Sequence, residues 1–244
     1  MSSQKLQKFL ADAGLASRRE IERMIEAGMI TVNRERAHVG QRINGDEKIE
    51  VNGKPFRIEQ ADETEVIMYH KPEGQVATRH DEQGRETVFD ALPRLRKGRW
   101  IMVGRLDINT SGLLLFTNNG ELANRLMHPS SEIEREYAVR VYGEVSPEIL
   151  QRLTEGVELE DGFSRFSRII DAGGEARNHW YHVILNRGRN REVRRLWESQ
   201  GVSVSRLIRV RFGSFVLPPR LKKGKFVRFN DEDMKVLREM LSQQ

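Results

Sequence analysis

The sequence contains no cysteine, and several other features that indicate particular classes of protein are also missing. Without cysteine the chain can form neither disulfides nor thiolate metal sites, and it has no thiol nucleophile. No apolar run approaches the length needed to cross a bilayer, and no charged-then-apolar leader opens the chain. We therefore expect a cytoplasmic protein that is neither secreted nor inserted in a membrane. Its 244 residues, 38% of them apolar, suffice for a folded, soluble protein of one or two domains.

Sequence motifs for metals and cofactors are also missing. The six histidines form no HExxH pattern, and neither a P-loop nor a dinucleotide-binding fingerprint occurs. His179 and His182 flank Trp180 and Tyr181 in what reads as a strand, so ordinary strand side chains are a simpler interpretation than metal ligands. The sequence therefore predicts no metal and no cofactor.

Positive charge is concentrated in one part of the chain. The formal net charge is only +5, but residues 187–225 hold twelve lysines and arginines against two glutamates. So local an excess favours binding to a polyanion, although a solvated basic surface is the alternative. Trp197, Phe212 and Phe215 lie within this stretch and suit either a core-facing sheet or contacts with bases.

The stretch GRLDINTSGLLLFTNNG, residues 104–120, places one carboxylate before an apolar strand. Leu113 to Phe116 is a short buried run with strand character, and Asn119-Gly120 is a turn signal that closes it. Asp107 precedes the strand in a polar turn, where it can act as a nucleophile or base. The alternative is that this aspartate only caps the turn.

Residues 1–60 are predicted to form a small separate domain. Apolar residues at helical spacing over 6–13 end at Gly14, and Ser17 with Glu20 forms a capping box for a second helix that buries Ile21, Met24 and Ile25 and ends at Gly28. A strand follows over 30–33. With its basic surface this helix pair resembles the S4 RNA-binding domain. A helical hairpin with an ordinary charged surface is the alternative.

The remaining residues, 61–244, are predicted to form a second domain of the α+β class. A linker is expected over 59–64, where apolar periodicity and strand propensity are both lacking. The strands are short and irregularly spaced, which favours a mixed, mostly antiparallel sheet over βαβ repeats. The predicted strands are 66–69, 138–141, 180–185, 206–212 and 226–229, and the predicted helices are 120–128, 147–155, 191–200 and 231–242.

Five motifs in order resemble those of RNA pseudouridine synthases in the family of the ribosomal small-subunit synthase A. They are YHKPEG (69–74), GRETVFDALP (84–93), the GRLD segment, EREYAVRV (134–141) and GRNREVRRLWE (188–198), which continues as VSRLIRVRFG (204–213). The resemblance covers nearly the whole chain, and it is strongest to members that act on the large-subunit ribosomal RNA. It implies an isomerase that converts a specific uridine of 23S ribosomal RNA to pseudouridine without cofactor or metal.

The resemblance also implies roles for individual residues. Asp107 matches the catalytic aspartate of the family, Tyr137 matches the tyrosine that packs on the target base, and Arg194 matches the basic partner of the aspartate. Arg195 is adjacent to Arg194, but helix neighbours point about 100° apart, so we expect only one of them at the carboxylate. Without its motif, Tyr137 would read as a half-buried strand residue. Residues 69–72 are expected to support the catalytic strand.

Several further residues are predicted to contact RNA. Arg105 is expected to hold the backbone or fill the vacated stack, and Leu207 to lie below the base. Basic residues expected to meet phosphates are Arg187, Arg189 and Arg191 in the second domain and Lys5, Arg18 and Arg19 in the first. The expected partner is ribosomal RNA or a precursor particle, bound by a monomer.

Three other functions compete with this prediction. The chain could be a non-catalytic ribosome-assembly factor, or a synthase of the same family with a different RNA target. The third alternative is a hydrolase of glycosidic bonds. Such an enzyme usually needs two carboxylates that flank the bond, and the GRLD segment offers no second carboxylate before Glu121.

Overall fold

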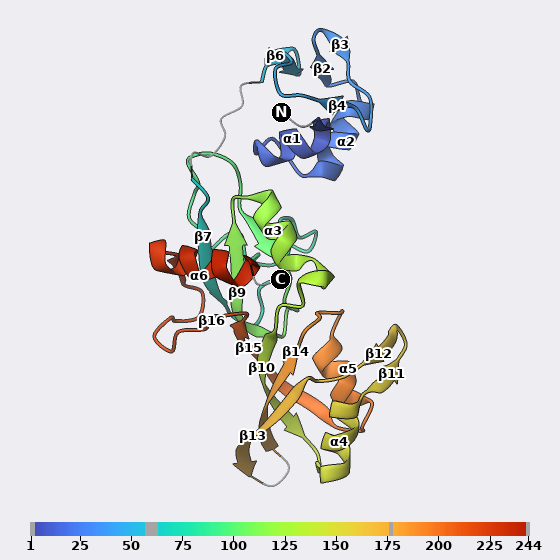
Figure 1. Cartoon of the computed structure of the whole chain (residues 1–244), viewed down its shortest axis with the longest axis vertical. Coiled ribbons are helices and arrows are strands. Elements are labelled where there is room, and N and C mark those ends of the chain that lie inside the picture. The colour runs from blue at the N-terminus through green and yellow to red at the C-terminus, as the bar shows by residue number, and fades with distance from the viewer. Residues whose placement is uncertain (1–2, 57–62, 176–177, 243–244) are drawn as a thin grey trace. The chain divides into compact units, whose positions relative to one another are not determined.

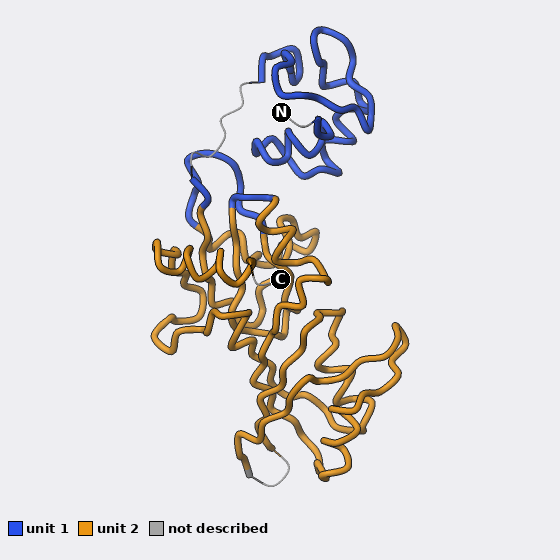
Figure 2. Tube along the Cα trace, in the orientation of Figure 1, with its two compact units in different colours: residues 1–64, 93–101, 118–120 blue, residues 65–92, 102–117, 121–244 orange. Residues whose placement is uncertain are grey.

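The computed structural model describes residues 3–56, 63–175 and 178–242, which form two compact units (Figures 1 and 2). Unit 1 comprises residues 1–64, 93–101 and 118–120, and unit 2 comprises 65–92, 102–117 and 121–244 (Figure 2). The expected linker lies partly outside the described residues. The domain boundary at residue 60 also falls there and stays a prediction.

Unit 1 contains the two helices that the sequence predicts. Helix α1 spans Leu6–Asp12 and helix α2 spans Arg18–Glu26. The side chain of Ser17 accepts a hydrogen bond from the Glu20 amide, so the predicted N-cap of α2 is present. Short strands complete the unit: β1 (Gln4–Lys5) pairs with β4 (Arg42–Ile43), and a four-stranded sheet has the order β3-β2-β5-β6, with β2 Ile30–Val32, β3 Glu35–Arg36, β5 Ile49–Val51 and β6 Lys54–Pro55.

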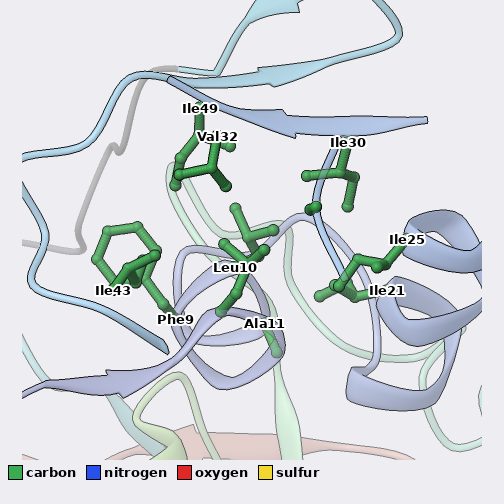
Figure 3. Close-up of a cluster of buried hydrophobic side chains, with 11 residues drawn as sticks. Phe9, Leu10, Ala11, Ile21, Ile25, Ile30, Val32, Ile43 and Ile49 are labelled. Atoms are coloured by element: carbon green, nitrogen blue, oxygen red, sulfur yellow. The ribbon is translucent and has the colours of Figure 1, made fainter. Parts of the chain in front are cut away.

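A single apolar cluster joins the helices of unit 1 to its strands (Figure 3). Leu10 of α1, Ile21 of α2 and Ile30 of β2 are completely buried in it. Met24, which the sequence predicts to be buried, packs against the cluster but is only partly buried. Loss of one such buried side chain to alanine costs roughly 2–5 kcal/mol, so this cluster is a large part of what holds unit 1 together.

Unit 2 is built on a nine-stranded mixed sheet, as the α+β prediction requires. Its main order is β13-β14-β10-β15-β9-β7-β17, with β8 added at β9 and β16 at β15. The strands are β7 Val66–Lys71, β8 Ile101–Val103, β9 Ser111–Thr117, β10 Arg135–Tyr142, β13 Arg168–Glu175, β14 Asn178–Leu185, β15 Ser203–Phe212, β16 Phe215–Val216 and β17 Phe226–Arg228. Apart from the parallel pair of β9 and β15, the pairings in its main order are antiparallel.

The four predicted helices of unit 2 are all present. They are α3 Gly120–Met127, α4 Pro147–Glu155, α5 Glu192–Glu198 and α6 Asp231–Ser242. A short hairpin of β11 (Val157–Leu159) and β12 (Gly162–Ser164), not predicted from the sequence, lies beside α5 (Figure 1). None of the helices in the described ranges is long and apolar enough to cross a membrane.

The parallel contact between β9 and β15 depends on a glycine. Gly112 has a φ of +113°, and a Cβ atom there would lie 2.3 Å from the backbone oxygen of Arg209. No L side chain fits so close an approach, so glycine is required. All seven residues of β9 are buried, and the strand therefore gives a rigid base to the turn that precedes it.

Candidate active site

Asp107 lies in a tight turn between β8 and β9, as the sequence predicts. The Thr110 amide donates a hydrogen bond of 3.0 Å to the Asp107 carbonyl, which closes the turn just before β9 begins at Ser111. Gly104 enters the turn with a φ of +76°, a conformation that favours glycine. The carboxylate is half-buried and reaches a cavity in unit 2.

The four consecutive backbone carbonyls of this turn, from Asp107 to Thr110, all accept hydrogen bonds. Lys71 Nζ donates to the carbonyls of Asp107 (3.0 Å) and Thr110 (2.9 Å). The Gly74 amide donates to Ile108 at 2.8 Å, and Arg194 Nη2 donates to Asn109 at 3.0 Å. Fixed in this way by residues 71–74 and by α5, the turn holds the Asp107 carboxylate in one place, and such preorganisation is a general requirement of catalysis.

Lys71 is a completely buried cation behind this turn. It ends β7 and has 0% of its surface exposed, and its third hydrogen bond goes to the Pro72 carbonyl at 3.0 Å. Burial lowers the pKa of Lys71 to about 8, although the nearby charges of Asp107 and Glu73 oppose that shift. The support that the sequence predicts from residues 69–72 therefore includes a direct contact with the turn that carries Asp107.

Arg194 is the second buried cation at the turn, with only 5% of its surface exposed. Besides the Asn109 carbonyl, it binds the Val204 carbonyl through Nη1 at 2.9 Å. Burial and the charge of Arg191 lower its pKa, whereas the charge of Asp107 raises it. Arg194 thus contacts the backbone of the turn. Its guanidinium and the Asp107 carboxylate interact through their charges, but among the described residues they form no ion pair within 4 Å. Its role as partner of the carboxylate stays a prediction.

Arg195 points away from the turn, as the helical geometry predicts. Its guanidinium binds both carboxylate oxygens of Asp161, at 2.7 and 2.9 Å. This pairing lies on the exposed side of α5 and raises the pKa of Arg195. Of the two neighbouring arginines, only Arg194 reaches the turn that carries Asp107.

The cavity beside Asp107 has a volume of about 560 Å³ and brings together most of the predicted site residues. Its walls come from the Asp107 turn, from β10 and β15, and from the segment before α5. Seven predicted residues line it: Asp107, Arg105, Tyr137, Arg187, Arg189, Arg191 and Leu207. Lys5, Arg18 and Arg19 lie in unit 1, where all three are exposed.

Tyr137 and Leu207 come from neighbouring strands and share one face of the sheet. Tyr137 on β10 pairs with Arg209 on β15, and Leu207 lies two residues before Arg209. Both predicted residues are buried yet line the cavity, so they form an apolar floor rather than an exposed surface. An aromatic ring at this place is suited to stacking on a planar base.

Arg135, Arg209 and Phe212 also line the cavity but were not predicted as site residues. The guanidiniums of Arg135 and Arg209 lie 5.3 and 5.6 Å from the centre of the Phe212 ring. Arg209 Nε also donates to the Leu113 carbonyl of β9 at 2.7 Å. For the two arginines a signal was available, because Arg135 lies two residues from Tyr137 and Arg209 two from Leu207, and alternate strand residues share a face. Phe212 pairs with Arg135 across the two strands.

Part of the arginine excess over 187–225 is used inside the protein. Besides Arg194 and Arg209, Arg211 is held by Glu136 (2.8 Å) and Glu134 (2.9 Å). Arg187 and Arg191 are more open, with carboxylates only at 3.9 and 3.8 Å. The surface available to a polyanion is therefore smaller than the count of basic residues suggests.

A second carboxylate, Glu192, lies in the cavity wall, but both of its oxygens are engaged. One accepts the Ser164 hydroxyl at 2.6 Å, and the other accepts the Arg189 amide at 2.8 Å. A buried carboxylate used in this way is poorly placed as the acid of a hydrolase. His179 and His182 bind Asp171 (2.6 Å) and Glu136 (2.7 Å), and within the described ranges no group of three or more possible ligands could hold a metal.

Comparison with known proteins identifies the family. The sequence profile of RNA pseudouridylate synthases matches residues 65–199, more than half of the chain, and the S4 domain profile matches residues 4–49. The chain belongs to the RNA pseudouridylate synthase family. Most residues that line the cavity fall within the matched range, and the fold and family predicted from the sequence are confirmed.

Similar RNA pseudouridylate synthases include proteins named ribosomal large subunit pseudouridine synthase B. The one from Pseudomonas aeruginosa is 56% identical over 97% of this chain, which spans 62% of the length of that relative. The one from Escherichia coli strain K12 is 54% identical over 98% of this chain and 84% of the relative. A crystal structure of a pseudouridylate synthase aligns with a TM-score of 0.67 at 23% identity, covering 96% of this chain and 99% of that one, which supports the fold.

Proposed function

We propose that the protein isomerises a specific uridine of the large-subunit ribosomal RNA to pseudouridine. The observation that carries this proposal is the Asp107 turn, which Lys71, Gly74 and Arg194 hold through all four of its carbonyls at the wall of a cavity. The target is inferred from the relatives, which share more than half of their aligned residues with this chain and carry the name of a large-subunit enzyme.

The reaction exchanges one glycosidic bond for another within the same nucleotide. The bond between N1 of the base and C1′ of the ribose breaks, the base rotates, and C5 bonds to C1′. The hydrogen that leaves C5 is balanced by one gained at N1, so no redox partner or group donor is needed. The residues required are those that bind the extruded base and that act on the sugar.

Asp107 is the residue that we assign to the chemical step, either by adding to the sugar or by removing a proton. In both cases it must act as a carboxylate, and two buried cations, Lys71 and Arg194, lie behind its turn. Tyr137 is assigned to stack on the base, with Leu207 below it. Extrusion of a base from a helix costs a few kcal/mol, and such stacking offsets part of that cost.

Basic side chains at the cavity rim are assigned to the RNA backbone. The cavity lining includes Arg105, which precedes Asp107 in the chain, and Arg187, Arg189 and Arg191, which precede α5. The exposed Lys5, Arg18 and Arg19 of the S4 domain are assigned to structured RNA away from the target uridine. We place the reaction in the cytoplasm, on ribosomal RNA or a precursor particle, with the protein acting as a monomer.

The test is to incubate the full chain with unmodified ribosomal RNAs and to map carbodiimide-reactive pseudouridines. One new site in the large-subunit RNA is expected. A new site only in another RNA would assign the enzyme a different target. Tight binding without any new site would instead indicate a non-catalytic assembly factor. A variant with Lys5, Arg18 and Arg19 changed to glutamine tests the S4 assignment, because it should lose affinity for intact ribosomal RNA more than for a short fragment.

A further inference from the structure

A second cavity adjoins the one that contains Asp107, and the function proposed above assigns no ligand to its interior. Its volume is about 350 Å³, within the range of small-ligand pockets. Four residues line both cavities: Leu185, Arg187, Arg189 and Glu192. The two hollows are therefore neighbours along one surface of unit 2, and a chain that occupies the first can extend directly into the second.

The side chain that distinguishes the second cavity is Phe163, on strand β12. It lines the cavity with 55% of its surface exposed, the second most exposed among the large apolar residues in the described ranges. Its ring rests on the backbone of Gly156, where a Cβ atom would lie 2.1 Å from the ring carbon Cζ. Gly156 has a φ of +117°, so the position has neither space nor a suitable backbone for a side chain. The ring is thus held in place although it is exposed.

The β11–β12 hairpin that carries Phe163 is attached to the wall shared by the two cavities. Arg189 Nη1 donates to the carbonyls of Asp161 (3.1 Å) and Gly162 (3.0 Å) in the hairpin turn. Ser164, the neighbour of Phe163, donates its hydroxyl to Glu192. Because Glu192 also binds the Arg189 amide, the hairpin and the segment before α5 form one connected structure. Phe163 therefore has a fixed place relative to the Asp107 cavity.

The charges around Phe163 favour an anion. Arg165 and Arg187 are exposed cations in the lining, and Arg189 adds a third. The carboxylates there are Glu132, which is 3.9 Å from Arg187, and Glu192, whose oxygens are already engaged. The lining also contains Asn186, whose buried side-chain oxygen accepts no hydrogen bond from the described residues. An aromatic ring, cations and a free acceptor together fit a nucleotide.

We propose that the second cavity binds a nucleotide next to the converted uridine, with its base stacked on Phe163 and its phosphate at Arg165 and Arg187. This inference rests on the proposed function, because it takes the ligand of the first cavity to be RNA. Unstacked bases are commonly bound by aromatic side chains beside a basic groove. The cavity therefore contributes to the choice of target, because it favours a uridine whose neighbouring nucleotide can unstack and bind there.

The experiment compares Phe163→Ala with Tyr142→Ala in the full chain. Tyr142 is a matched control because its side chain is 49% exposed but lines neither cavity. The probe is a fragment of the large-subunit RNA that contains the mapped uridine, and its Kd is measured by fluorescence anisotropy. Since stacking on one aromatic ring contributes ~1–3 kcal/mol, we expect Phe163→Ala to raise Kd about tenfold and Tyr142→Ala to change it less than about twofold.

A second set of RNAs, each with one abasic nucleotide beside the uridine, tests the contact itself. For one position, loss of the base should raise the Kd of the wild-type protein by a similar factor, and Phe163→Ala should then cause no further loss. Phe163→Leu, which keeps apolar contact with Gly156, should behave like Phe163→Ala.

The inference is overturned when Phe163→Ala binds as tightly as the wild type, or when its loss persists on every abasic RNA. Failure of the proposed function is a different result, the absence of pseudouridine with the wild-type protein.

Discussion

Lys71 and Arg194 hold the same four-residue turn from two different elements, Lys71 through the carbonyls of Asp107 and Thr110 and Arg194 through that of Asn109. Lys71 ends β7, whereas Arg194 lies on α5, more than 120 residues later in the chain. Neither contact involves a carboxylate. Both cations therefore fix the path of the backbone, and at the same time they place positive charge behind the one side chain assigned to the chemistry.

Replacement of Lys71 should reduce both the activity of the protein and its free energy of unfolding. Lys71→Met removes three hydrogen bonds and leaves the Asp107 and Thr110 carbonyls with fewer donors, so we expect a loss of about 1–3 kcal/mol in the free energy of unfolding. A shift of the carboxylate by about 1 Å can reduce turnover by roughly 100-fold. Single-turnover conversion and denaturant unfolding measure the two effects, with the exposed Lys223→Met as control. Normal turnover in Lys71→Met would show that the turn needs no such support.

Deprotonation of Lys71 at alkaline pH should lower the activity, although it raises the contribution of Lys71 to the free energy of unfolding. Burial lowers the pKa of Lys71 to about 8, below its ordinary value of 10.5. Between these values the unfolded chain holds the proton and the folded chain does not, so the contribution of Lys71 to the free energy of unfolding rises with pH. A neutral amine has only two hydrogens to donate, however, so it cannot keep all three of its contacts with the Pro72, Asp107 and Thr110 carbonyls, and it no longer places a positive charge behind the turn. We expect kcat to fall with an apparent pKa near 8, without a matching rise in Kd for RNA. A flat kcat profile from pH 7 to 9 would contradict this role.

Asp107→Asn should abolish pseudouridine formation and leave RNA affinity within a few fold. The amide has nearly the same shape as the carboxylate but cannot add to the sugar or take a proton. The contacts that hold the turn are made by backbone carbonyls and do not depend on this side chain. Conversion of a uridine-containing ribosomal fragment and its Kd are the two measurements. Residual turnover comparable to the wild type would remove Asp107 from the chemical step.

Sequence periodicity was sufficient to locate elements that bury one face, such as α4 and α6, whose predicted bounds are those observed. It missed β13 and the short β11–β12 hairpin, in which only Ser164 is buried, and in β13 Gly173 and Gly174 interrupt the alternation of polar and apolar residues. The position of Asp107 and Tyr137 at one cavity could be expected from the motifs that contain them, while their roles in catalysis stay predictions. The contacts of Lys71 and Arg194 could not, because every residue has the same backbone carbonyl and the acceptors leave no trace in the sequence.

Gly112→Ala should destabilise unit 2 more than an alanine at another glycine of positive φ. A Cβ atom at Gly112 would lie 2.3 Å from the Arg209 oxygen, so β9 and β15 must separate in addition to the backbone strain. We expect a loss of more than ~2 kcal/mol in the free energy of unfolding. Gly224 is the control, because its φ is +75° and nothing lies within 4 Å of the added atom, which leaves a strain of about 1–2 kcal/mol. Equal losses for the two variants in denaturant unfolding would contradict the close approach.

Arg194 and Arg195 offer a comparison between adjacent residues of one helix. Arg194→Met loses the hydrogen bonds to the Asn109 and Val204 carbonyls and a charge near Asp107. Arg195→Met loses the exposed pair with Asp161 and a hydrogen bond to the Asn190 carbonyl, but no contact with the turn. We expect kcat to fall by about 100-fold or more in Arg194→Met, with little change in KM, because the contact positions the catalytic turn rather than the RNA. Arg195→Met should keep kcat within a few fold. Steady-state kinetics on the mapped ribosomal fragment separate the two, and thermal unfolding of both variants checks that α5 remains folded. Equal losses of kcat in the two variants would mean that the helix as a whole, rather than the contact from Arg194 to the turn, is what the reaction requires.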